Sequence, residues 1–200
     1  MNRRTVILAL GGAGILVSTV ACGQIAPEAA DGVAPPGSAQ RPETNPAGDI
    51  PDNQAFVPFT AADGTYSVTV PEGWSRAVTG SATVFTDKFN SVRIETKAQP
   101  GTPTVADAQA TELPVIARQA QGFKPGKVSG EQRKTGPVVL LTYQADSRID
   151  AVTGKSVPQQ VERYEFWRPA TEVMITLSSP VGADNVDPWR TVTDSFQWRP

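Results

Sequence analysis

Short runs in which apolar and polar side chains alternate dominate residues 56–200 of the chain. In the run 66–70, Tyr66, Val68 and Val70 alternate with small hydroxyl residues, a pattern typical of a half-buried strand. The apolar run 138–141 lacks alternation, which predicts an interior strand that is covered on both faces. Seven strands are predicted in this way, at 66–70, 82–86, 91–97, 127–134, 138–145, 160–168 and 173–178. The last four form two hairpins, with turns predicted at Gly136-Pro137 and Pro169-Ala170.

Residues 104–121 have the spacing of an amphipathic helix. Leu113, Ile116, Ala117 and Ala120 form an apolar stripe, Thr104 and Asp107 resemble a capping pair, and Gly122 suits the end of the helix. Pro114 lies inside the stripe and lacks the N–H that a helix interior needs. We therefore expect Pro114 to kink or divide this helix.

A second, shorter helix is predicted near the C-terminus. Asp187 is expected to cap it and Pro188 to occupy its first position, while Trp189, Val192 and Phe196 share one face. Strands joined by short turns pair antiparallel. The order of elements therefore predicts an α+β fold, a mostly antiparallel sheet of about six to seven strands packed with two or more helices.

The N-terminus has the features of an export signal. Arg3 and Arg4 precede an uncharged run over 6–21, which is short of the ~20 residues that span a membrane. Thr19-Val20-Ala21-Cys22 resembles the lipobox of bacterial lipoproteins, and this resemblance implies cleavage after residue 21 and diacylation of the Cys22 thiol. Two alternatives stay open: an ordinary signal peptide with an incidental cysteine, and export by either the general or the twin-arginine route.

Residues 22–55 differ in composition from the rest of the chain. Six prolines, five acidic residues and a single base at Arg41 leave too little apolar surface to offset chain entropy. We interpret 1–21 as a lipoprotein signal peptide, 22–55 as a disordered Pro/Ala-rich acidic tether and 56–200 as one globular domain. The predicted location is the extracytoplasmic face of the cell membrane, held there by fatty acyl groups such as palmitate.

The residue composition excludes several classes of catalytic and metal-binding site. The chain has no histidine and one cysteine, which excludes Ser-His-Asp and Cys-His catalysis and histidine-ligated zinc. A net charge of −2 gives no basis for binding nucleic acid. We therefore predict no catalytic residue, no cofactor and no metal site. One enzymatic alternative stays open, a hydrolase with two carboxylates that the fold sets ~5–10 Å apart.

Two short motifs carry a family resemblance. The segment 66–74, Tyr-Ser-Val-Thr-Val-Pro-Glu-Gly-Trp, is similar to the opening strand and turn of PsbP-like domains. Asp187-Pro188-Trp189, followed by Asp194-Ser195-Phe196, is similar to the closing helix of actinobacterial lipoproteins of the LpqN type. The resemblance implies an α/β/α sandwich that is used mainly for binding and assembly, without catalytic residues.

One strand suggests a binding surface. In 160–168, alternation places Tyr164 and Phe166 on one face and Arg163, Glu165 and Trp167 on the other. A tryptophan among charges is either covered by a helix or part of a surface that faces a partner. We predict Trp167 and Arg163 as binding residues.

These features together predict a lipid-anchored, non-enzymatic protein of the cell envelope. It would bind a protein partner or a small ligand at the outer face of the membrane. The alternatives are a carboxylate-dependent hydrolase acting on envelope polymers and an accessory subunit of an envelope complex.

Overall fold

The computed structural model describes residues 47–150 and 153–200. The predicted signal peptide, Cys22 and residues 22–46 of the predicted tether lie outside this part of the chain. Among the described residues, no helix is long and apolar enough to cross a membrane.

The described chain forms two antiparallel sheets. The larger has seven strands in the order β3-β4-β5-β9-β8-β7-β6, and the smaller has the order β1-β2-β10. The strands of the larger sheet are β3 Ser75–Thr79, β4 Ala82–Asp87, β5 Asn90–Gln99, β9 Ala170–Pro180, β8 Pro158–Arg168, β7 Gly136–Asp146 and β6 Lys124–Arg133. Those of the smaller are β1 Phe56–Thr60, β2 Tyr66–Pro71 and β10 Gln197–Trp198.

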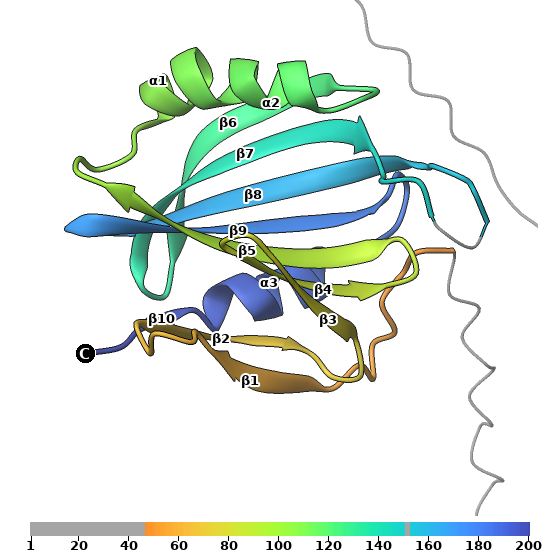
Figure 1. Ribbon diagram of the computed structural model, residues 1–200, viewed down its shortest axis with the longest axis horizontal. Coiled ribbons are helices and arrows are strands. Elements are labelled where there is room, and N and C mark those ends of the chain that lie inside the picture. Colours follow the sequence, from red (N-terminus) through yellow and green to blue (C-terminus); the bar gives the residue numbers. More distant parts are fainter. Residues whose placement is uncertain (1–46, 151–152) are drawn as a thin grey trace, which may run out of the picture. The chain divides into compact units, whose positions relative to one another are not determined.

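Helices cover both faces of the larger sheet (Figure 1). On one face lies a helical segment made of α1 Val105–Asp107, a π-helical turn at Ala108–Glu112 and α2 Leu113–Gln119. On the other face lie α3 Val186–Asp194 and the smaller sheet. The predicted α+β class is therefore confirmed, with the small sheet sharing a layer with α3.

The main hydrophobic core lies between the larger sheet and the α3 layer. Phe196, just after α3, is fully buried and stacks on Phe166 of β8 and on Tyr66 of β2, with ring centroids 4.2 and 5.6 Å apart. Trp189 and Val192 are buried beside it. The predicted apolar face of this C-terminal helix is thus confirmed, and it joins the two sheets.

A smaller apolar cluster lies under the α1–α2 segment. Ala108, Val128, Val139 and Leu141 are buried there, and Leu113 packs against them. The neighbours of Val139 and Leu141 on β7, at positions 138 and 140, point into the main core. The apolar run 138–141 is therefore covered on both faces, as predicted.

The helix predicted at 104–121 forms, and it is divided as Pro114 led us to expect. Thr104 Oγ1 accepts a hydrogen bond from the Asp107 backbone N–H at 3.1 Å, which confirms the cap. Five residues, Ala108–Glu112, adopt a π-helical turn before Pro114 in the first turn of α2. Gly122 follows with a φ of 63°, a conformation that favours glycine.

Two local predictions were wrong. Arg133 pairs with Gly136, so the β6–β7 turn lies at residues 134–135 and Pro137 belongs to β7. Asp187 does not cap α3, because the helix begins earlier and the Trp189 N–H donates to the Asn185 carbonyl.

Three strands, β1, β3 and β10, were not predicted, because none has an alternating buried face; in β1 Phe59 alone is buried. All five residues of β3 are exposed, and β10 has only two residues. The predicted strand 66–70 belongs to the smaller sheet.

Part of the predicted tether belongs to the folded body. Ile50 is buried in the main core, and its N–H donates to the side-chain carbonyl of Asn185 at 2.7 Å. The side-chain amide of Asn185 donates in turn, through Nδ2, to the Gly48 carbonyl at 3.0 Å. Residues 48–50 are therefore fixed against the segment that leads into α3.

Candidate functional site

Charged side chains gather between the larger sheet and the α1–α2 segment. Four of them come from neighbouring strands: Lys97 on β5, Arg163 and Glu165 on β8, and Glu172 on β9. They face the same side because β5 and β8 both pair with β9, and directly paired residues share a face of the sheet. Glu112 joins them from the π-helical turn. We call these five residues the charge cluster.

Two carboxylates of the charge cluster are sealed from solvent. Glu165 and Glu172 are 1% and 0% exposed. Lys97 Nζ lies 3.1 Å from Glu112 Oε1 and 3.3 Å from Glu172 Oε2. Arg163 lies 3.4 Å from Glu112 Oε2 through Nη2 and 3.6 Å from Glu165 Oε1 through Nε. Each buried acid therefore has a cation beside it.

The acids differ in their affinity for protons. Burial, together with the neighbouring carboxylate of Glu112, raises the pKa of Glu165 to about 8. Burial also raises the pKa of Glu172, against the attraction of Lys97. Burial acts on Glu112 in the same sense, but hydrogen bonds from Glu165 and Lys97 hold its pKa below the ordinary value. At neutral pH Glu165 is therefore mostly protonated.

This arrangement balances charge without a metal ion. Oxygen atoms of Glu112, Glu165 and Glu172 all lie within 4.8 Å of one another, as they would around a shared cation. Lys97 and Arg163 already contact these oxygens. With Glu165 protonated, at most two negative charges, on Glu112 and Glu172, face the two positive charges of Lys97 and Arg163. The residues present therefore fit an internal salt-bridge network better than a metal site.

Two acids with opposite pKa shifts are also what a hydrolase needs. Access argues against that use. A cavity of about 440 Å³ beside the helices is lined by Lys97, Glu112 and Arg163, whereas Glu165 and Glu172 do not reach it. The acid with the raised pKa therefore cannot contact a substrate in this conformation.

The two predicted binding residues lie on this same side of the sheet. Arg163 is 16% exposed, and its guanidinium is engaged in the charge cluster. Trp167 is half-buried, and its indole N–H donates to the Gln99 carbonyl at 3.1 Å. Their role in binding stays a prediction.

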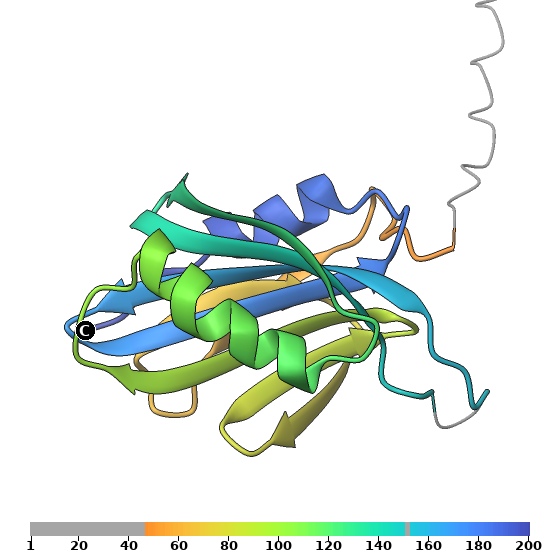
Figure 2. The same ribbon diagram turned by 90° about the horizontal axis from the view of Figure 1, so that it is seen from above.

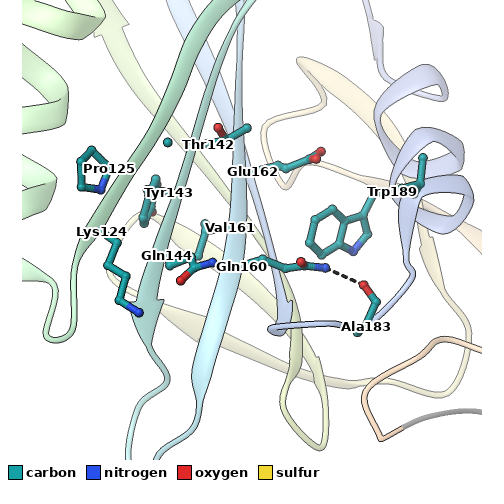
Figure 3. A pocket seen from close by; sticks show the side chains of 12 residues that line it. Lys124, Pro125, Thr142, Tyr143, Gln144, Gln160, Val161, Glu162, Ala183 and Trp189 are labelled. Carbon is teal, nitrogen blue, oxygen red and sulfur yellow. Dashed lines mark hydrogen bonds between the residues drawn. The ribbon is translucent and has the colours of Figure 1, made fainter.

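A groove opens on the opposite side of the sheet, beside α3 (Figure 3). Its volume is about 560 Å³. The side chains of Thr142, Gln144, Gln160 and Glu162 line it from β7 and β8, and Trp189 of α3 faces them. Gln160 Nε2 donates to the Ala183 carbonyl at 2.6 Å, which fixes one edge. We call this the α3 groove.

The α3 groove is the polar continuation of the main core. Even-numbered residues of β7 face the core as Val138 and Leu140, and the same face continues with Thr142 and Gln144. On β8 the same change occurs between Tyr164 and Glu162. This switch from apolar to polar along one face is the signal in the sequence that marks the groove.

The wall of the α3 groove away from α3 is formed where the backbones of β6 and β7 approach each other closely. A β-bulge interrupts the pairing of β6 with β7 between Pro125 and Val128. At this bulge a side chain on Gly126 would place its Cβ 2.4 Å from the Thr142 carbonyl oxygen. Only glycine allows the two strands to approach in this way.

Comparison with known proteins supports the fold alone. No protein-family model matches the chain, and no curated protein is matched. Among solved structures, the cyanobacterial PsbP protein CyanoP from Synechocystis sp. PCC 6803 is 13% identical, with a TM-score of 0.52 over 78% of this chain and 99% of its own. The Ran-binding protein Mog1p of Saccharomyces cerevisiae is 9% identical, with a TM-score of 0.51 over 72% and 95%.

A Bacteroides thetaiotaomicron protein is also similar, at 12% identity and a TM-score of 0.46 over 72% of this chain. This chain spans about half the length of that protein, 48%. The likeness to CyanoP shows that the described domain has a PsbP-like fold, as the sequence motifs implied.

Proposed function

We propose that this protein is a lipid-anchored, non-enzymatic binding protein of the cell envelope, and that it holds a partner at the α3 groove. The observation that carries the proposal is the contrast between the two sides of the sheet. Glu165 and Glu172 are sealed from solvent, whereas the α3 groove is open and combines amide and hydroxyl groups, which suit reversible hydrogen bonding, with apolar side chains such as Trp189.

The similar structures are consistent with this use of the fold. Mog1p is a Ran-binding protein, so one protein of this fold binds a protein partner. We extend that kind of role, and not that partner, to this chain. A groove of this size, with amide and hydroxyl groups beside apolar side chains, accommodates a short extended segment of a protein or a small ligand.

Site-specific cross-linking tests the groove. A photoreactive amino acid in place of Gln144 should cross-link a discrete partner in intact cells, and the same group in place of Arg118, which is exposed on α2, should not. Equal cross-linking from both positions, or none from Gln144, would contradict the assignment of the α3 groove.

The anchor rests on the lipobox resemblance around Cys22. We expect radiolabelled palmitate to enter the wild-type chain and not Cys22→Ala, which should also keep its signal peptide. A palmitate label that persists in Cys22→Ala would refute the anchor without bearing on the groove.

A carboxylate-dependent hydrolase is the second candidate, favoured by the opposite pKa shifts of Glu165 and Glu112. It requires the α1–α2 segment to move and admit an envelope polymer. Release of soluble fragments from purified cell walls by the wild type, abolished by Glu165→Gln, would establish it. Equal release by both proteins, or none, would reject it.

A further inference from the structure

Figure 2 shows that α1 and α2 leave one end of the larger sheet uncovered. A second groove lies there, on the α1–α2 side of the sheet. Strands β3, β4 and β5 form its floor, and residues 147–150 form one wall. Its volume is about 410 Å³. It is on the other face of the sheet from the α3 groove and shares no lining residue with it. We call it the β4–β5 groove.

Positive charge distinguishes this groove. Lys88, Arg93 and Arg148 line it with a single lining acid, Asp150, and Glu95 is paired with Arg93, so three positive charges stand against two negative ones in a chain whose net charge is −2. Among the described residues, the side chains of Lys88 and Arg148 make no hydrogen bond or ion pair. Arg93 binds Glu95 through Nε and Nη2, which leaves Nη1 unpaired within that part of the chain.

Hydroxyl donors lie on the floor of the groove. Ser91 Oγ and Ser178 Oγ are 2.7 Å apart, so one of their two protons bridges the pair. The second proton is free to be donated to a ligand. Thr86 adds a further hydroxyl from β4. Cations beside hydroxyl donors form the chemical complement of an oxyanion.

The backbone at Lys88 is strained. Asp87 pairs with Asn90, so Lys88 and Phe89 form a two-residue turn, and Lys88 has a φ of 51°. Turns of this kind ordinarily place glycine or asparagine at such a position, since a long side chain there costs free energy. Glycine would relieve the strain but would remove a cation from the rim of the groove. Strain of this kind is typical of functional sites.

Part of the remaining lining is apolar. Val84 and Ala77 lie on the floor, Phe89 follows Lys88, and Ile149 on the loop is 73% exposed. From this combination we propose that the β4–β5 groove binds a small anionic ligand whose phosphate or carboxylate group contacts Lys88, Arg93 and Arg148 and whose apolar part contacts Phe89 and Ile149.

The proposal is tested by titrating the isotope-labelled folded chain with phenyl phosphate and with inorganic phosphate, with NMR detection of the backbone amides. We expect saturable shifts at Lys88, Arg93 and Arg148, with phenyl phosphate binding more tightly. Lys88→Gly and Arg148→Gln should each weaken phenyl phosphate about fivefold, the upper end for one solvent-exposed ion pair. Arg118→Gln, on exposed α2, should change nothing.

Two further measurements separate the effect of backbone strain from that of charge, and a lipid headgroup from a free anion. Lys88→Gly should raise the melting temperature while it weakens binding, whereas Ala170→Gly relieves a similar strained φ of 67° far from the groove and should leave binding intact. Dihexanoyl phosphatidylglycerol distinguishes a lipid headgroup from a free anion as the source of the ligand. Shifts that do not saturate, that fall elsewhere, or that survive both charge-removing variants overturn the proposal, whatever the cross-linking at the α3 groove shows.

Discussion

Replacing Glu165 with glutamine should change how the stability of this protein depends on pH. Glu165 is buried, and its pKa is raised from 4.5 to about 8 by burial and by the carboxylate of Glu112. Between these two values the folded protein holds a proton that the unfolded chain has released. The free energy of unfolding therefore falls as pH rises through this window. Glu172, whose pKa is also raised, acts in the same direction.

The magnitude follows from proton linkage. One proton of difference changes the free energy of unfolding by about 1.4 kcal/mol per pH unit, so the wild type should lose roughly 3 kcal/mol between pH 5 and pH 7 from Glu165 alone. Glutamine carries no charge in either state, and its N–H can donate to Glu112 as the protonated acid does. Glu165→Gln should therefore be nearly free of this loss, apart from the smaller contribution of Glu172.

Urea denaturation at several pH values measures this effect directly. The comparison uses the difference between the two pH values within each protein, so any packing change caused by the amide cancels. Glu72→Gln is the matched control, because Glu72 is exposed and should follow the wild type. A wild type whose stability rises from pH 5 to pH 7, or a Glu165→Gln variant with the same slope as the wild type, would refute the reasoning.

Three further substitutions test the packing. Lys97→Met leaves the buried carboxylate of Glu172 without its cation, and should cost about 2–3 kcal/mol in urea denaturation because Lys97 is itself partly exposed. Phe196→Ala removes a fully buried ring that joins the two sheets, and calorimetry should show a loss of about 3–5 kcal/mol. Gly126→Ala forces a clash with the Thr142 carbonyl, and should lower the melting temperature and shift the amide NMR signals around the α3 groove; an unchanged spectrum would contradict the close approach.

The pattern of side chains was sufficient for most of the large sheet. In strands with one buried face the alternation is visible in the sequence; in β5, for example, Val92 and Ile94 are buried and alternate with Arg93, Glu95 and Lys97. The division of the helix at Pro114 could also be predicted from the sequence, because a residue without a backbone N–H disturbs a helix whatever surrounds it. Local signals failed at β3, whose five residues are all exposed, because without burial no periodic pattern exists.

The sites depended on pairing between distant strands. The sequence contains the acids of the charge cluster at positions 112, 165 and 172, but nothing local states that a π-helical turn and two strands bring them together. Likewise Trp167 could be interpreted as covered or exposed, and the fold placed it half-buried against Gln99. The same holds for the β4–β5 groove, whose cations come from a turn, a strand and a loop.

The amino-acid order by itself determined the α+β class, the positions of seven of the ten described strands and the absence of histidine chemistry, and it predicts an address outside the cytoplasm through the lipobox resemblance at Cys22. These depend on residue type and on spacing of a few positions along the chain. The tertiary structure alone decided which charges are neutralised, which side chains reach solvent and where the surface is hollow. Burial and pKa depend on every group within a few ångströms, and those neighbours come from segments far apart in the sequence.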